Sequence, residues 1–231
     1  MCGRVALFTP PAHLARFLSA ALAAGLDPEG APSWNVGPQR TLFAAAEGPE
    51  GRVLDRYRWG LVPSWAKSPE VGNRLFNARG ETVAEKPSFR AAFRSRTCAI
   101  PVDGFYEWDH RPGGNRQPHY FTRVDGNPLV LAGLYEHWRD PATDEALATC
   151  TVITTEPSVD LELIHDRMPV VLDPDDLEVW LDVSDHDPAA RQGLLRPAPT
   201  GTLTHHAVTK AVGSVRNDGP GLIEPESTTL F

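Results

Sequence analysis

The chain has 231 residues, of which 41% are hydrophobic, with a formal net charge of −8 at pH 7 and three cysteines. This length suits one large domain or two small ones, and no apolar run approaches a transmembrane span. The odd number of cysteines and the lack of a Cys-x-x-Cys pair argue against a disulfide framework or a zinc site, and are typical of a reducing compartment. No signal peptide opens the chain, so we expect a cytoplasmic protein, associated with the nucleoid if its source is bacterial.

Charge is distributed unevenly along the chain. Residues 74–123 hold nine Lys and Arg against five Asp and Glu, whereas residues 140–187 hold one Arg against fourteen acidic residues. A basic middle can bind phosphate while an acidic region keeps the molecule soluble. A solvated surface of uneven charge explains the same pattern, so charge alone does not decide the partner.

The first half of the chain alternates strand-like runs with helices and Pro- and Gly-rich loops. Thr9 can cap a helix with two prolines in its first turn, and apolar residues at helical spacing continue that helix to Gly25. Loops are expected over 27–40 and 66–80, and helical stretches over 81–95. Strands are expected over residues 5–8, 41–46 and 53–62, the last two as a hairpin.

The second half is richer in strands. Turns are expected at 112–115 and 125–127, where Gly and Asn gather. Short helices are expected over residues 157–163, 174–181 and 187–195. Strands are expected over residues 97–102, 104–109, 117–124, 128–138, 147–154, 170–172 and 205–212.

Strands outnumber helices and follow one another through tight turns. This order predicts an α+β fold, with residues 1–231 forming a single domain on an antiparallel, barrel-like β-sheet with peripheral helices. Residues 219–231, which contain Gly and Pro, are expected to form a flexible C-terminal tail.

The first residues of the chain carry its most reactive candidate. Cys2 is small enough for Met1 to be removed, which leaves a free α-amine and a thiol on the same residue. Their reference pKa values, about 7.7–8.0 and about 8.5, leave both groups partly deprotonated near neutral pH. Such an amine can attack an aldehyde to form an imine, and the thiol can then close a thiazolidine ring. Taken alone, the cysteine is equally well explained as an accident of position.

Three further polar residues are flanked by apolar or turn-forming neighbours. Glu107 lies among aromatic residues, where desolvation raises the pKa of a carboxylate and suits it to proton transfer. His165 lies in a loop and carries the side chain best suited to exchange protons near neutral pH. Asn77 can orient a substrate. Each has a structural alternative: a solvent-facing strand residue for Glu107, a helix cap for His165 and a turn residue for Asn77.

The remaining candidates are weaker. Trp65 lies in a loop, where an exposed indole can stack on a nucleobase, although tryptophans around Gly and Pro more often pack a corner. Cys98 and Cys150 lie in apolar, strand-like runs and are expected to be inert buried thiols. The other seven histidines form no recognisable ligand set, so no metal and no cofactor are expected.

Seven motifs, taken in order, resemble the SRAP family, the SOS-response-associated peptidase proteins, whose members act on abasic sites in single-stranded DNA. They extend from the first residue to the tail, so the resemblance covers nearly the whole chain. The motifs are Met1-Cys2-Gly3-Arg4, Asn35-Val36-Gly37-Pro38, Trp59-Gly60-Leu61-Val62-Pro63-Ser64-Trp65, Asn77-Ala78-Arg79-Gly80-Glu81-Thr82, Gly104-Phe105-Tyr106-Glu107-Trp108, His165-Asp166-Arg167-Met168-Pro169 and Ala211-Val212-Gly213-Ser214-Val215-Arg216-Asn217. Gly37 departs from the family, which more often has Ala there.

The resemblance implies a role for each candidate at the reaction centre. It implies that Cys2 bonds covalently to the ring-opened aldehyde of an abasic site and forms a stable thiazolidine. It implies that Asn77 holds the N-terminus and the sugar, and that Glu107 handles protons at the α-amine. It implies that His165 acts as acid and base in opening the sugar and in reversing the crosslink.

The resemblance also implies DNA contacts and a second activity. Arg4, Arg79 and Arg167 match positions expected to contact phosphates, and Trp65 matches an aromatic residue that packs on a base near the lesion. The family is also named for a proposed peptidase activity, thought to remove residues before the cysteine. Only Met1 precedes Cys2 here, so an ordinary methionine aminopeptidase would suffice.

The sequence therefore predicts a monomeric protein that captures abasic sites in single-stranded DNA through Cys2 and shields the lesion, with no membrane partner. One alternative is a cysteine-dependent peptidase, in which Cys2 attacks a peptide carbonyl with Glu107 or His165 as base. Another is a non-catalytic module that binds single strands through the basic segment and Trp65 alone.

Overall fold

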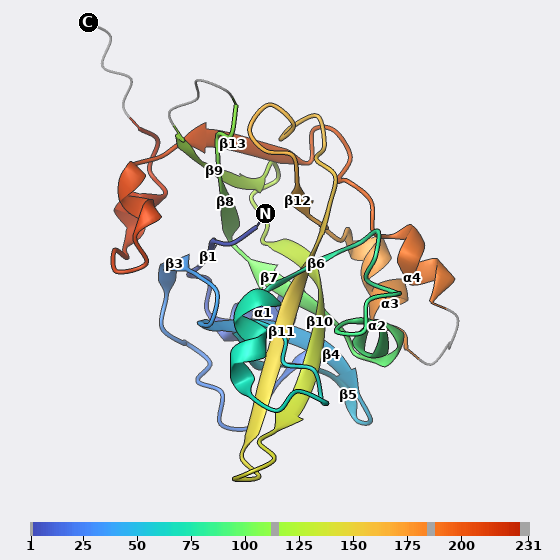
Figure 1. Cartoon of the computed structure of the whole chain (residues 1–231). Coiled ribbons are helices and arrows are strands. Elements are labelled where there is room, and N and C mark those ends of the chain that lie inside the picture. Colours follow the sequence, from blue (N-terminus) through green and yellow to red (C-terminus); the bar gives the residue numbers. More distant parts are fainter. Residues whose placement is uncertain (1, 112–115, 184–187, 227–231) are drawn as a thin grey trace, which may run out of the picture.

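The computed structural model describes residues 2–111, 116–183 and 188–226. Most of the strands form a closed barrel and a second, open sheet, which share one hydrophobic core. In Figure 1 the barrel strands lie in the lower half, with β8, β9 and β13 of the open sheet above them. The expected α+β fold on a barrel-like sheet with peripheral helices is confirmed.

Five strands form the barrel, in the order β5–β4–β7–β10–β11 with β11 pairing back onto β5. They are β4 (Thr41–Gly48), β5 (Gly51–Trp59), β7 (Thr97–Val102), β10 (Leu129–Arg139) and β11 (Ala146–Thr155). The closing pair is parallel, with Thr149 opposite Arg58 and Cys150 opposite Trp59. An odd number of strands that alternate in direction can only close in this way, so the barrel is mixed rather than wholly antiparallel as expected. All of β7 is buried, which explains why its sequence shows no polar alternation.

The open sheet is antiparallel throughout and has the order β13–β9–β8–β1–β3. Its strands are β1 (Val5–Leu7), β3 (Ser33–Val36), β8 (Gly104–Trp108), β9 (Pro118–Arg123) and β13 (Leu203–Ala207). One face, with Phe105 and Phe121, belongs to the core shared with the barrel. The other face, with Tyr106 and Tyr120, is covered by Leu222 and other residues near the C-terminus.

Short elements surround these two layers. The helices are α1 (Pro11–Phe17), α2 (Arg90–Ser95), α3 (Pro174–Leu181) and α4 (Ala189–Gly193), and the 3-10 helices are η1 (Pro69–Arg74), η2 (Lys210–Gly213) and η3 (Pro220–Leu222). Three short strands extend the barrel sheet: β2 (Ala21–Leu22) beside β5, and β6 (Asn77–Arg79) and β12 (Met168–Pro169) beside β11. Among the described residues, no helix is long and apolar enough to cross a membrane.

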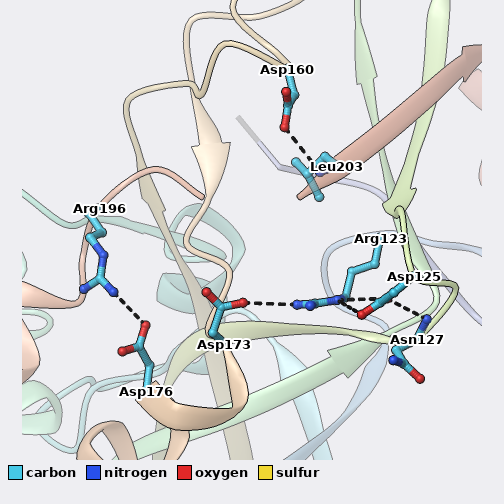
Figure 2. A network of polar contacts seen from close by, with 8 residues as sticks. All are labelled: Arg123, Asp125, Asn127, Asp160, Asp173, Asp176, Arg196 and Leu203. Carbon is cyan, nitrogen blue, oxygen red and sulfur yellow. Dashed lines mark hydrogen bonds and ion pairs between the residues drawn. The ribbon is translucent and has the colours of Figure 1, made fainter. Parts of the chain in front are cut away.

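Ion pairs and backbone contacts anchor the loops beside β9 and β13 (Figure 2). Arg123, at the end of β9, pairs with Asp125 in the following turn and with Asp173 at the start of α3. The carboxylate of Asp160 accepts hydrogen bonds from the backbone N–H groups of Gly201 and Leu203. These last contacts tie the loop that precedes His165 to the beginning of β13.

Several sequence predictions were wrong where tertiary pairing overrides local pattern. The first helix ends at Phe17 rather than Gly25, because Ser19 has a positive φ and β2 pairs with β5. The loops expected over 27–40 and 66–80 contain β3 and β6. Residues 157–163 form consecutive turns rather than a helix, residues 81–89 form turns ahead of α2, and the last strand ends at Ala207.

The first part of the segment expected to form a C-terminal tail contains a short 3-10 helix. Leu222 is buried in η3, and the backbone N–H of Glu226 donates to the carbonyl of Ala207. Residues 219–226 therefore pack against the open sheet. The rest of that tail, 227–231, and the turn expected at 112–115 lie outside the described residues.

Candidate functional site

Cys2 lies at the centre of the molecule, just before β1. The register of β1 against β8 pairs Val5 with Phe105, and the backbone N–H of Tyr106 donates to the carbonyl of Arg4 at 2.9 Å. Continuing this register places Gly3 opposite Glu107. Cys2 itself is completely buried, so the strand pairing brings the start of the chain beside the carboxylate of β8.

Asn77 holds Cys2 in place from the barrel side. It begins β6, which pairs with β11 through Val152, and its Nδ2 donates to the carbonyl oxygen of Cys2 at 2.7 Å. A carbonyl only accepts, so this bond fixes which way the amide faces. The Asn77 Oδ1 is buried and accepts no hydrogen bond within the described residues. The amide therefore anchors the N-terminal segment and presents an acceptor beside it.

Glu107 and His165 form a buried acid–base pair. They are 2% and 5% exposed, and Glu107 Oε2 lies 3.7 Å from His165 Nε2. The backbone N–H of Arg167 donates to His165 Nδ1 at 2.9 Å. The carbonyl oxygen of Arg167 also lies 3.2 Å from Nδ1, so Nδ1 has both a donor and an acceptor within reach, while Nε2 faces Glu107. Asp166 lies 3.0 Å from Nδ1 and would pair with it once the ring is protonated.

Burial reverses the usual order of the two pKa values. It raises the pKa of Glu107 to about 7 and lowers that of His165 to about 4. The raised pKa of Glu107 agrees with the sequence analysis. The expectation that His165 titrates near neutral pH is wrong, because an imidazolium in this dry environment loses its hydration. Glu107 is therefore the member of the pair that exchanges protons at neutral pH.

The thiol of Cys2 is held in its protonated form. Burial raises its pKa well above the ordinary value, and the negative charge of nearby Glu107 raises it further. A thiol of this kind attacks only when a neighbouring base takes its proton in the same step. Glu107 is the carboxylate that stands close enough to affect it.

Glu107 and His165 line an open pocket of about 670 Å³, called the reaction pocket below, whereas Cys2 and Asn77 are not among its lining residues. Gly3, Glu107 and His165 belong to its inner wall, and Trp108 and Lys210 stand at other points of the lining. The complete lining is Gly3, Pro38, Phe76, Glu107, Trp108, His110, Arg116, His165, Lys210 and Gly213. The pocket thus connects Glu107 and His165 with solvent and reaches Gly3, the neighbour of the buried Cys2. No three His, Cys, Asp or Glu side chains in the described ranges converge as metal ligands.

Comparison with known proteins gives the family. Residues 1–215 match the family described as SOS response associated peptidase (SRAP). The chain belongs to the SRAP family.

Similar SRAP proteins are known from bacteria and animals. "Abasic site processing protein YoqW" of Bacillus subtilis (strain 168) is 38% identical over 232 residues, which cover 97% of this chain and 99% of that protein. "Abasic site processing protein HMCES" of Gallus gallus is 35% identical over 226 residues, covering 84% of this chain and 66% of that protein. A crystal structure of a protein from Bacteroides thetaiotaomicron shares the fold with a TM-score of 0.84 and 25% identity, covering 98% of this chain and 100% of that one.

Two of the three arginines expected to contact phosphate in this SRAP protein already have protein partners. Arg4 donates to Asn35 Oδ1 at 2.7 Å and to the carbonyl of Val212, and its guanidinium lies over the ring of Trp108 at 5.8 Å from its centre. Arg167 forms a two-pronged ion pair with Glu81 and is 14% exposed. Both side chains therefore hold neighbouring segments of the site together.

Arg79 and Trp65 fit their expected roles better. Arg79 is exposed, and its guanidinium forms no hydrogen bond or ion pair within the described part of the chain. Trp65 is 61% exposed, although it is not among the residues that line the reaction pocket. Such an indole on the surface is free to stack on an unpaired base.

Sequence reasoning missed several residues of the SRAP site. Asn35 and Glu81 both lie within quoted motifs, but their partners, Arg4 and Arg167, are far away in the chain. His110 packs edge-on against His165 with ring centres 4.5 Å apart. Only its position two residues after the Gly104–Trp108 motif points to it. Cys98 and Cys150 are fully buried, as expected.

Proposed function

We propose that this SRAP protein captures abasic sites in DNA by a covalent thiazolidine bond through Cys2, after removal of Met1. The observation that carries the proposal is that four separated segments bring Cys2, Asn77, Glu107 and His165 together: Asn77 holds Cys2, Glu107 lies near its thiol, and Glu107 and His165 line the pocket beside them. The names of the relatives YoqW and HMCES, abasic site processing proteins, support it. The crosslink would shield the lesion until repair.

The chemistry balances with protein groups alone. The cyclic sugar opens when its ring oxygen gains a proton and its anomeric hydroxyl loses one, which exposes the aldehyde. The neutral α-amine of Cys2 adds to the aldehyde carbon, and loss of water leaves an imine. The thiol sulfur then bonds to the same carbon, and the thiol proton passes to the imine nitrogen. The net change is the loss of one water molecule.

Each neighbour has a step that its geometry suits. Glu107, with a pKa of about 7, accepts a proton from the adding amine and returns it to the departing water, and then passes the thiol proton to the imine nitrogen during ring closure. His165 presents Nε2 to Glu107 and lines the pocket, and with its proton on Nε2 it donates to the sugar ring oxygen. Asn77 holds the Cys2 carbonyl and offers Oδ1 to a sugar hydroxyl. His165 is therefore assigned to sugar opening and reversal, and Glu107 to both bond-forming steps.

Single-stranded DNA is the proposed substrate. An unpaired strand can enter the open pocket and stack a base on Trp65, whereas a duplex keeps its bases paired. The exposed Arg79 is placed to contact a backbone phosphate. Arg4 and Arg167 contribute by holding the pocket walls. Nothing in this scheme requires a second copy of the chain, so a monomer is proposed to act.

The peptidase alternative fits the site less well. Cysteine peptidases depend on a thiolate, which requires a lowered thiol pKa. Burial and Glu107 raise the pKa of Cys2 instead, which suits a thiol that reacts only after the amine has captured an aldehyde.

The test is a denaturing gel of the purified chain with a single-stranded oligonucleotide bearing one abasic site. Mass spectrometry of the N-terminus run in parallel establishes whether Met1 has been removed. We expect a denaturation-resistant adduct whose mass equals protein plus DNA minus one water. Cleavage of a peptide library without any DNA adduct would favour the peptidase, and reversible binding without an adduct would favour a binding module.

A further inference from the structure

A second hollow lies beside the reaction pocket, on the far side of one segment of the chain. Its volume is about 570 Å³, and it is lined by Ser33, Asn35, Val36, Arg40, Thr41, Val215, Arg216 and Asp218. Residues 209–218, called the C-terminal ridge here, supply lining residues to both hollows. Lys210 and Gly213 face the reaction pocket, and Val215 and Arg216 face the second hollow.

Asn35 clamps this ridge onto the open sheet. Its buried amide donates to the carbonyls of Val212, Ser214 and Asn217, at 3.3, 3.0 and 2.7 Å. Val212, a residue of the ridge itself, is completely buried. The ridge is therefore held in one position between the two hollows, although most of its side chains are exposed.

Two arginines in the lining of the second hollow have no ion-pair partner among the residues described. Arg40 and Arg216 are exposed, and neither guanidinium has an ion pair or hydrogen bond among the residues described. The backbone of Arg40 is anchored to the barrel, since its carbonyl accepts from the Trp59 N–H at 2.8 Å. The one carboxylate in the lining, Asp218, already accepts from the backbone N–H groups of Trp34 and Gly219 through Oδ1.

We propose that the second hollow binds backbone phosphates of the DNA strand that flanks the reacting sugar. This inference rests on the proposed function and extends it from the lesion to its neighbours. A strand that places one sugar in the reaction pocket and crosses the ridge passes Lys210 and then reaches Arg216 and Arg40. No aromatic side chain lines the second hollow, so it binds the charged DNA backbone rather than the bases.

The charge of the hollow favours a polyanion over other occupants. Two arginines present forked donors that match phosphate oxygens, and the wall residues Ser33 and Thr41 add hydroxyl groups. An apolar partner segment would leave both guanidinium groups desolvated and unpaired, at a considerable free-energy cost. A negatively charged, flexible strand satisfies them and is continuous with the substrate of the adjoining pocket.

The test compares the double variant Arg40→Gln/Arg216→Gln with wild type and with Arg139→Gln. Arg139 lies at the far end of β10 in an exposed pair with Asp144, so it serves as a matched control for loss of surface charge. Binding is measured across a salt series to single strands of about 15 and about 4 nucleotides carrying a stable, unreactive abasic analogue; both lengths lie within typical single-strand site sizes.

We expect the double variant to bind the long strand more weakly, with a salt slope shallower by about 1.4, because each lost phosphate contact on a single strand contributes about 0.7. Affinity for the short strand, crosslinking to a strand of the same short length that carries a reactive abasic site, and the thermal midpoint should all match wild type. Equal salt slopes for the double variant, the control and wild type would overturn the inference. Failure of wild type to bind either strand would instead overturn the proposed function, and this inference with it.

Discussion

The inner wall of the reaction pocket is dry, whereas the surface around it is charged and open to solvent. Cys2, Glu107 and His165 are all buried, and burial moves the pKa of each. Lys210 and Arg216 on the ridge are exposed to solvent. Desolvation shifts the pKa values of groups that must exchange protons. Exposed charges attract a polyanion without the free-energy cost of burying a charge.

This contrast separates rate from affinity. Changes on the inner wall should alter the speed of bond formation and leave the binding of an unreactive analogue nearly intact. Changes on the outer surface should alter affinity and its salt dependence and leave the chemistry intact once DNA is bound.

Loss of the thiol should have the largest effect. Cys2→Ala keeps the α-amine, so it should still form a transient imine that borohydride can trap, but no ring can close. The denaturation-resistant adduct should disappear on a gel. Retention of Met1, or an N-terminal tag, should be as damaging. Cys98→Ala, which removes a thiol from the barrel core, is the control and should crosslink normally; a normal adduct from Cys2→Ala would contradict the mechanism.

Glu107→Gln should slow crosslinking by about 10²–10⁴-fold, the usual contribution of a positioned acid or base. Single-turnover rates from pH 5 to 9 should show two inflections in wild type, one near 7 from Glu107 and one from the α-amine at about 7.7–8.0. Only the second should remain in the variant. His165→Ala should slow sugar opening and reversal without removing an inflection, because the pKa of His165 is about 4.

The exposed carboxylate Glu162 provides the matched control for that experiment. Glu162→Gln removes an equal charge close to His165 in sequence and should leave the profile unchanged. An inflection near 7 that persists in Glu107→Gln would assign it to another group.

The sequence predicted elements that local pattern determines better than pairings between distant segments. Hairpins and α3 follow from local pattern, and the bounds of α3 were predicted to the residue. β3 and β6 were read as loops because their pairings with β1 and β11 join distant segments. The same limitation hid the partners of Arg4 and Arg167. A motif shows that an arginine is present, but it does not show that the guanidinium already pairs with Asn35 or Glu81.

The pKa of His165 shows a second limit. The aromatic residues next to Glu107 in the sequence indicated a dry environment, which predicted that the pKa of its carboxyl is raised. His165 has polar neighbours, Asp166 and Arg167, and its burial comes from the folded loop and the His110 ring beside it. Burial that arises from tertiary packing leaves no local signal.

Removal of the exposed indole should have an intermediate effect, on affinity alone. Trp65→Ala should weaken binding of the unreactive abasic analogue in single-stranded DNA by about 1–3 kcal/mol, the usual value of one stacked base. Trp65→Phe keeps a ring and should retain most of that affinity. At saturating DNA both variants should crosslink at the wild-type rate. A reduced rate at saturation, or equal affinity for duplex and single strands in wild type, would argue against stacking.

The smallest effect should be a gain in stability on removing the buried charge. The pKa of Glu107 rises from an ordinary value of 4.5 to about 7 in the folded protein. Between these values the folded carboxyl keeps a proton that the unfolded chain has released. Stability from Glu107 is therefore complete below pH 4.5 and is lost as pH rises through 7.

Glu107→Gln is neutral at every pH and keeps polar atoms facing His165 Nε2. Relative to wild type, its thermal midpoint should be similar at pH 4 and higher at pH 8. The expected gain is on the order of 5 °C, since a few kcal/mol at most is involved. His165, whose pKa is lowered, destabilises the fold as pH falls from 6.5 towards 4, but it does so in both proteins. A midpoint that falls at pH 8 in the variant would mean that the ionised carboxylate stabilises this fold, contrary to the dry inner wall described here.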